Sequence, residues 1–212
     1  MPELPEVETT RRGVLPHVVG HRICKVKVRQ RKLRWPLPHK FEQALRNARV
    51  HNVDRRAKYL LFETDLGTLL LHLGMSGSLR VVDTGTVATP HDHVDIVLDN
   101  GKVLRFNDPR RFGSMHWVTT NPLDHPLLKS LGPEPLENEF SADFLFAMTR
   151  KKRVAIKIFI MNSRNVVGVG NIYASEALFL AGIRPGKQAG RLTRVQCARL
   201  CAAVKKILRA AI

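Results

Sequence analysis

The hydrophobic pattern of this chain of 212 residues changes its period part-way along, and that change limits the folds open to it. Up to about residue 117, short runs alternate between apolar and polar side chains, which is typical of β-strands. From about residue 139, apolar residues recur at the spacing of one helix face. Prolines 122, 126, 133 and 135 lie between and predict a linker over residues 119–138. The pattern predicts an α+β chain with domains at residues 1–118 and 139–212.

The first domain is predicted to be a β-sandwich or barrel with a leading helix. Pro5 suits a first helical turn, and Glu6 favours the positive end of a helix dipole, so residues 1–20 are the expected helix. Asn100 and Gly101 predict a tight hairpin turn between two strands. The expected strands cover residues 24–28, 59–62, 68–73, 78–82, 94–98 and 102–106.

The second domain is predicted to be all helical. Thr193, followed three residues later by Gln196, has the pattern of a capping box and predicts the start of the last helix. Cys197 and Cys201 lie one turn apart on that helix and are expected to be apolar packing positions. The expected helices cover residues 141–152, 154–162, 171–181 and 193–212.

The composition indicates a polyanionic partner. Lys and Arg number 35 against 18 Asp and Glu, a net charge of +17, which favours nucleic acid or an acidic membrane surface. No apolar run is long enough to span a bilayer, and the charged first residues are unlike a secretory signal. Cys24, Cys197 and Cys201 form no CxxC pair, so we expect a reduced, cytoplasmic protein without disulfides or a cysteine-built zinc site.

The start of the chain holds a pair of residues suited to covalent chemistry on a sugar. Pro2 is small enough to allow removal of Met1, which would leave a secondary amine beside the carboxylate of Glu3. A secondary amine that attacks the C1′ carbon of a sugar gives an iminium ion, which acts as an electron sink, and a nearby carboxylate can move protons. Most chains that begin in this way make no use of the pair, so this chemistry alone does not assign a function.

Seven segments in a fixed order carry a more specific signal. They are MPELPEVETTRRG (1–13), RRAKYLL (55–61), HLGMSGSLR (72–80), HDHVD (91–95), DPRRFG (108–113), LGPEPL (131–136) and VVGVGNIYASEALF (166–179). Together they resemble the bacterial formamidopyrimidine-DNA glycosylases over essentially the whole chain. The resemblance implies an enzyme that removes oxidised purines, such as 8-oxoguanine and formamidopyrimidines, from duplex DNA and then nicks the strand by β- and δ-elimination. It also implies a helix-two-turn-helix domain in residues 139–212.

The resemblance gives roles to three catalytic candidates. Pro2 would be the nucleophile and Glu3 the proton donor, in agreement with the chemistry of a terminal secondary amine. Lys58 would contact the phosphates of the damaged nucleotide and assist β-elimination. Lys58 lies in a strand-like segment beside Arg55 and Arg56, and a cation on a rigid strand suits phosphate anchoring. The alternative for Lys58 is a solvated basic strand.

Three further residues would hold the duplex open. A base can be attacked only after it leaves the stack, so the vacancy must be filled and the orphaned partner satisfied. The resemblance implies that Met75 and Phe112 are apolar wedges and that Arg110 offers hydrogen-bond donors to the partner base. Without it, Met75 and Phe112 would be taken for core residues and Arg110 for a surface charge. The related endonuclease VIII enzymes, which prefer oxidised pyrimidines, use other residues there and lack the PELPE start.

The remaining candidates are DNA contacts. Residues 168–171 precede a helix, and their glycines would let the backbone approach a phosphate. The resemblance implies that Asn171 binds a phosphate, whereas the alternative is a plain helix-entry turn capped by Asn171. His72, His91 and Lys152 are further implied DNA contacts. The sequence His91-Asp92-His93 suggests a metal site, but no other ligand pattern supports one.

Members of the family that the chain resembles end in a zinc ribbon with two CxxC pairs, which has no counterpart in these 212 residues. We therefore expect no cofactor in this chain, and a structural zinc ion only if a ribbon exists beyond Ile212. The alternative to an active glycosylase and lyase is a truncated module that binds DNA damage with impaired catalysis. We expect a monomer that binds damaged double-stranded DNA and no membrane, in the bacterial cytoplasm at the nucleoid.

Overall fold

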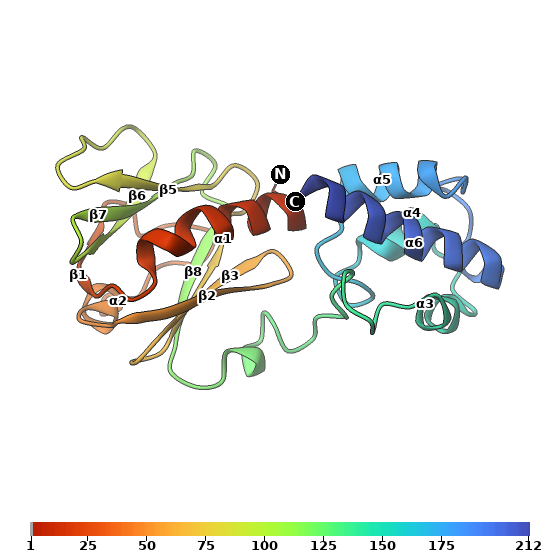
Figure 1. Ribbon diagram of the computed structural model, residues 1–212, viewed down its shortest axis with the longest axis horizontal. Coiled ribbons are helices and arrows are strands. Elements are labelled where there is room, and N and C mark those ends of the chain that lie inside the picture. The colour runs from red at the N-terminus through yellow and green to blue at the C-terminus, as the bar shows by residue number, and fades with distance from the viewer. Residues whose placement is uncertain (1) are drawn as a thin grey trace. The chain divides into compact units, whose positions relative to one another are not determined.

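The computed structural model of the protein describes residues 2–212, which divide into two compact units (Figure 1). The first unit consists of Pro2 and residues 6–128, and the second consists of residues 3–5 and 129–212. Antiparallel sheets with a leading helix form the first unit, and helices form the second. The predicted α+β class is confirmed.

The first unit contains two four-stranded antiparallel sheets, with strand orders β1-β6-β7-β5 and β2-β3-β4-β8. Helix α1 (Leu4–Val18) leads into this unit, and the short helix α2 (Phe41–Leu45) follows β1. The strands are β1 (Ile23–Val28), β2 (Val50–Arg56), β3 (Tyr59–Thr64), β4 (Thr68–His72), β5 (Ser78–Asp83), β6 (Asp92–Leu98), β7 (Lys102–Asn107) and β8 (Ser114–Val118).

Both sheets and helix α1 contribute to one apolar core. Ile96 and Phe106 come from the first sheet, Leu60 and Leu71 from the second, and Val14 from α1, and each is at most 3% exposed. Burial of one such side chain stabilises a fold by about 1.5–3 kcal/mol. This shared core is the predicted sandwich with its leading helix.

Four elements of the first unit were not predicted: α2, β2, β8 and the short 3-10 helix η1 (Pro122–Asp124). The apolar residues of β2 are Val50 and Val53, three positions apart, so this strand lacks the period-two pattern. The six expected strands are present, and Gly101 adopts the positive φ of 78° that the expected hairpin requires. Strands β1 and β6 contain register shifts in their pairing and were still predicted, because apolar residues recur at every second position in each.

The second unit contains four α-helices, all of them predicted. The capping box at α6 is present, because Gln196 N–H donates to Thr193 Oγ1 at 3.2 Å and Thr193 N–H donates to Gln196 Oε1 at 3.1 Å. Cys197 and Cys201 pack inside this unit at 0% and 7% exposure, as expected. The helices are α3 (Ala142–Thr149), α4 (Ile156–Met161), α5 (Asn171–Leu180) and α6 (Arg194–Ala211).

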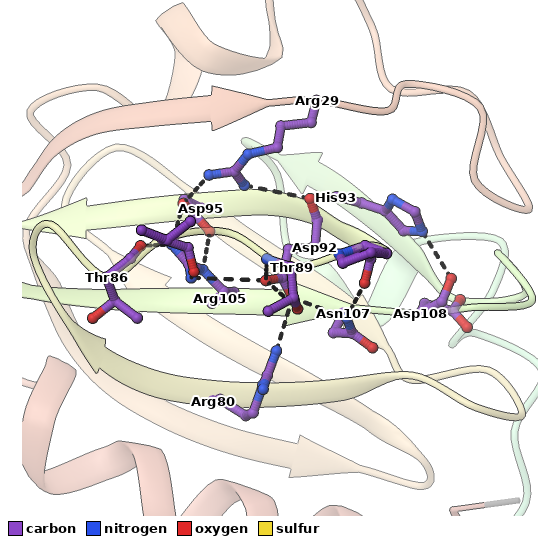
Figure 2. Close-up of polar contacts among 12 residues, drawn as sticks. Arg29, Arg80, Thr86, Thr89, Asp92, His93, Asp95, Arg105, Asn107 and Asp108 are labelled. Carbon is purple, nitrogen blue, oxygen red and sulfur yellow. Dashed lines mark hydrogen bonds and ion pairs between the residues drawn. The ribbon is translucent and has the colours of Figure 1, made fainter.

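A buried ion pair joins β6 to β7 in the first sheet (Figure 2). Arg105 Nε donates to Asp95 Oδ1 at 2.8 Å and Nη2 donates to Asp95 Oδ2 at 3.0 Å, and Arg29 donates to the same carboxylate. The Arg105 guanidinium also donates to the carbonyls of Thr86 and Val87. This arginine therefore anchors the loop that leads into β6.

We expect Asp95→Asn to lower the free energy of unfolding by about 1.5–3 kcal/mol, because the buried Arg105 guanidinium loses its hydrogen-bonded carboxylate and keeps only the carboxylate of Asp92, at 3.7 Å. Urea denaturation followed by circular dichroism measures the loss. Asp83→Asn is the matched control, since Asp83 pairs with Lys102 at the surface and its substitution should change stability little. Equal losses in the two variants would contradict a stabilising role for the buried pair.

Candidate DNA-binding and catalytic residues

The carboxylate of Glu3 caps helix α5, although 167 positions separate Glu3 from Gly170, the N-cap residue of that helix. Glu3 Oε2 accepts from the N–H of Gly170 at 2.7 Å and of Tyr173 at 3.4 Å, and Oε1 accepts from the N–H of Ile172 at 3.0 Å. The side chain is 1% exposed. A helix N-terminus has unpaired N–H groups and a partial positive charge, so a carboxylate is well suited to it. Glu3 is thus fixed in place one residue after Pro2.

Two glycines before α5 make room for residues 3 and 4. A Cβ on Gly170 would lie 2.3 Å from Glu3 Cδ, and one on Gly168 would lie 2.6 Å from Leu4 Cδ1. Leu4 N–H also donates to the carbonyl of Gly168 at 3.0 Å. The alternative in which Asn171 caps the helix is wrong, because the N-cap residue is Gly170 and Asn171 is the first helical residue, with an exposed side chain.

Pro2 is half-buried, and Met1, whose removal we predict, lies outside the described residues. Lys58 lies in the two-residue turn between β2 and β3 and not on a strand, which corrects the prediction. The turn carried no sequence signal because its positive φ of 56° falls on Ala57 and not on glycine or asparagine.

A cluster of charged residues around Glu8, which the sequence did not predict, supports the turn that carries Lys58. Glu8 is 8% exposed and accepts from Arg11, Arg12 and Arg55. Burial raises the pKa of Glu8, but hydrogen bonds from Arg11 and Arg12 and the nearby charges of Arg11 and Arg55 outweigh it and lower the pKa to about 2. Arg55 also donates to the carbonyl of Ala57 at 2.9 Å, so Glu8 and Arg55 together hold the turn that carries Lys58.

The structure brings three predicted DNA contacts, His72, Met75 and Phe112, to one cavity of about 350 Å³. Met75 is 41% and Phe112 is 38% exposed, so the alternative that they are core residues is wrong. The guanidinium of Arg110 stacks over the Phe112 ring at 4.8 Å. The cavity is lined by Arg34, Trp35, Tyr59, His72, Gly74, Met75, Phe112, Ser114 and Leu127.

His72 is a neutral hydrogen-bond donor in this cavity. Its Nδ1 accepts from Gly74 N–H at 2.9 Å, so the ring proton is on Nε2. Burial lowers the pKa of His72 to about 4, and the positive charges of Lys58 and Arg34 add to the effect. An Nε2–H group of this kind can donate to a phosphate oxygen without itself carrying charge.

The other candidates lie on separate segments. His91 is exposed and has a positive φ of 72°, and Lys152 is exposed after the end of α3. His93 is buried, and its Nε2 donates to the carbonyl of Asp108 at 2.8 Å (Figure 2). Within residues 2–212, no group of three or more His, Cys, Asp and Glu side chains could hold a metal ion.

Comparison with known families assigns the chain. Residues 1–115 match the formamidopyrimidine-DNA glycosylase N-terminal domain, and residues 131–212 match the formamidopyrimidine-DNA glycosylase H2TH domain. The chain belongs to the formamidopyrimidine-DNA glycosylase family. This result confirms the resemblance found in the sequence.

Curated members of the glycosylase family match the chain over its whole length. The formamidopyrimidine-DNA glycosylase of Thioalkalivibrio sulfidiphilus is 60% identical over 212 residues, which are 100% of this chain and 78% of that protein. The enzyme of Pseudomonas aeruginosa strain LESB58 is 55% identical with the same coverage. These glycosylases support a place for the chain in DNA base excision repair.

Solved structures of the family agree with the fold. Lactococcus lactis Fpg in complex with a Fapy-dG containing DNA has a TM-score of 0.93 at 31% identity, covering 99% of this chain and 80% of that one. MutM (Fpg) from Thermus thermophilus has a TM-score of 0.87 at 38% identity, covering 99% and 76%. DNA is therefore the supported partner. None of the helices in residues 2–212 has the length and apolar character of a membrane span.

We expect the imidazole of His72 to titrate with a pKa of about 4 in an NMR experiment, because burial and two neighbouring cations oppose its protonation. Lys58→Met should move the midpoint upward, since it removes one of those cations. A midpoint at the ordinary histidine value in the unmodified chain would contradict the buried, neutral assignment.

We expect Gly170→Ala to displace the Glu3 carboxylate, because the added Cβ would lie 2.3 Å from Glu3 Cδ. Charge-assisted hydrogen bonds contribute about 1.5–3 kcal/mol each, so loss of one should lower the melting temperature measurably. Gly186→Ala is the control, since a Cβ there meets nothing within 4 Å. Thermal melting that is the same for both variants would show that the cap tolerates the displacement.

Proposed function

We propose that the protein removes oxidised purines, 8-oxoguanine and formamidopyrimidines, from duplex DNA and then cleaves the abasic site as a lyase. The observation that carries the proposal is the buried carboxylate of Glu3, held by α5 one residue after a proline that can become the chain terminus. Family membership supports the glycosylase activity, and the relative bound to Fapy-dG DNA supports this lesion class.

In the proposed reaction the Pro2 nitrogen attacks the anomeric carbon of the damaged nucleotide. The glycosidic bond breaks with its electrons on the base, which takes up the proton that the Pro2 nitrogen loses. Glu3 then takes a proton from solvent and passes it to the ring oxygen as the bond from the anomeric carbon to that oxygen breaks, and the nitrogen lone pair forms an iminium ion. Loss of a proton from the adjacent carbon expels the 3′ phosphate, and a second elimination expels the 5′ phosphate. Addition of water to the iminium carbon then releases Pro2 and leaves the sugar fragment as an aldehyde.

Two residues beside the cavity have the chemistry to hold the phosphates of the damaged nucleotide. Lys58 supplies a positive charge from a turn braced by Arg55, and His72 supplies a neutral N–H donor. We propose that both bind phosphate oxygens and that Lys58 also assists β-elimination. His91, Lys152 and Asn171 are exposed polar residues and are proposed as further backbone contacts.

The vacancy left by the extruded base also needs an occupant. Met75 and Phe112 present apolar surface at 41% and 38% exposure, and Arg110 lies against the Phe112 ring. We propose that the two apolar side chains fill the vacancy while Arg110 donates to the base opposite the lesion.

We expect borohydride to trap a covalent adduct between this chain and a duplex that contains 8-oxoguanine. Hydride adds to the iminium carbon and fixes the Pro2–sugar bond, so intact mass should show both the adduct and the absence of Met1. Pro2→Gly should weaken trapping, because a primary amine remains. Lesion binding without any adduct would favour the alternative, a module that binds DNA damage with impaired catalysis.

Glu3→Gln should reduce base excision by about 10²–10⁴-fold, the usual contribution of a positioned general acid. Because Glu3 also caps α5, the melting temperature and DNA affinity of the variant are measured beside its activity. A fully active Glu3→Gln protein, or a fully active protein that retains Met1, would contradict the mechanism.

A further inference from the structure

The loops that carry Met75 and Arg110 are joined by a serine and an aspartate to which the mechanism gives no task. Ser76 Oγ donates to Asp108 Oδ1 at 2.7 Å, and the N–H of Arg110 donates to Ser76 Oγ at 3.2 Å. One hydroxyl is therefore both donor and acceptor between the two loops. It links the residue after Met75 to the backbone of Arg110 itself.

Asp108 is 0% exposed, and all its polar groups have partners. Its Oδ2 accepts from Gly113 N–H at 2.8 Å, so the carboxylate spans the loop from 108 to 113. Its own N–H donates to the carbonyl of His91 at 3.0 Å, and its carbonyl accepts from His93 Nε2 at 2.8 Å. The aspartate is therefore fixed to the start of β6 (Figure 2) as well as to the two loops.

The backbones of the two loops also touch directly. A Cβ on Gly74 would lie 2.4 Å from the carbonyl carbon of Phe112, and one on Gly113 would lie 2.9 Å from the carbonyl oxygen of His72. Gly74 has a φ of 69°, which other residues adopt only with strain. Contacts this close leave no room for a side chain at position 74 or 113, so the two loop backbones pack against each other there.

We propose that Ser76 and Asp108 are positioning residues that lock the Met75 loop and the 108–113 loop into one rigid wedge. The inference rests on the proposed function, in which Met75, Phe112 and Arg110 enter the duplex together. Loops that move independently would lose conformational freedom when their three side chains enter the duplex. Loops that are already locked together would lose less. Because Ser76 holds the N–H of Arg110, it also sets the direction from which Arg110 meets the opposite base.

Ser76→Ala tests the proposal, with Ser76→Thr as the variant that keeps the hydroxyl and Ser78→Ala as the control. Ser78 is an exposed residue of β5 two positions along the same segment. The measurements are kcat/KM for excision of 8-oxoguanine opposite cytosine and opposite adenine, affinity for undamaged duplex, and fluorescence of 2-aminopurine placed beside the lesion to follow base extrusion.

Ser76→Ala removes both hydrogen bonds of the hydroxyl and should reduce kcat/KM opposite cytosine by about three- to tenfold, because only part of their free energy bears on the reaction. The ratio of kcat/KM opposite cytosine to kcat/KM opposite adenine should move toward one, base extrusion should slow, and affinity for undamaged DNA should stay within about twofold. Ser76→Thr should restore that ratio, and Ser78→Ala should match the unmodified chain.

The outcomes separate this inference from the proposed function. An unmodified chain that extrudes and excises no lesion contradicts the proposed function itself. An active unmodified chain whose Ser76→Ala variant keeps the same ratio of kcat/KM opposite cytosine to kcat/KM opposite adenine contradicts the wedge alone. Equal losses opposite cytosine and adenine, together with a lower melting temperature, would reduce Ser76 to a stabilising residue and would also overturn the proposal.

Discussion

The start of helix α5 depends on the hydrogen bonds that its first N–H groups donate to the Glu3 carboxylate. Helix α5 has no side-chain cap of its own from the residue before it, so its first N–H groups depend on a residue from the other end of the chain. The close approach requires glycine at 168 and 170. The same contacts hold the carboxylate beside Pro2 in the chain, so one set of bonds serves both the helix and the proposed chemistry.

Patterns of local origin were predictable, and contacts between distant residues were not. The capping box at Thr193 and the turn at Gly101 depend on neighbours in the sequence, and both are present. The cap on α5 joins residues 167 positions apart, and no local pattern reports it. Family resemblance named Met75 and Phe112, but only their exposure distinguishes them from core residues. Ser76 and Asp108 lie in two of the segments that carry the resemblance, but no role could be assigned to them from the sequence because their hydrogen bond joins residues 32 positions apart.

Part of the positive charge of the chain is engaged in ion pairs inside the fold. Of the 35 basic residues, Arg105 is engaged with Asp95 inside the first sheet, and Arg11 and Arg55 are engaged with Glu8. Those guanidiniums brace β6, β7 and the Lys58 turn, so part of the charge that first indicated a nucleic-acid partner has a structural role. Its contribution to DNA binding is indirect, through the loops that it holds.

The neutral state of His72 has a consequence for how ionic strength acts on the site. A protein cation that binds a DNA phosphate releases condensed counterions, and that release makes affinity fall as salt rises. Lys58 brings such a charge, but an imidazole with a pKa of about 4 brings none at neutral pH. If both side chains bind the DNA backbone, they would thus respond differently to ionic strength. Added salt would weaken phosphate binding by Lys58 and leave phosphate binding by His72 nearly unchanged.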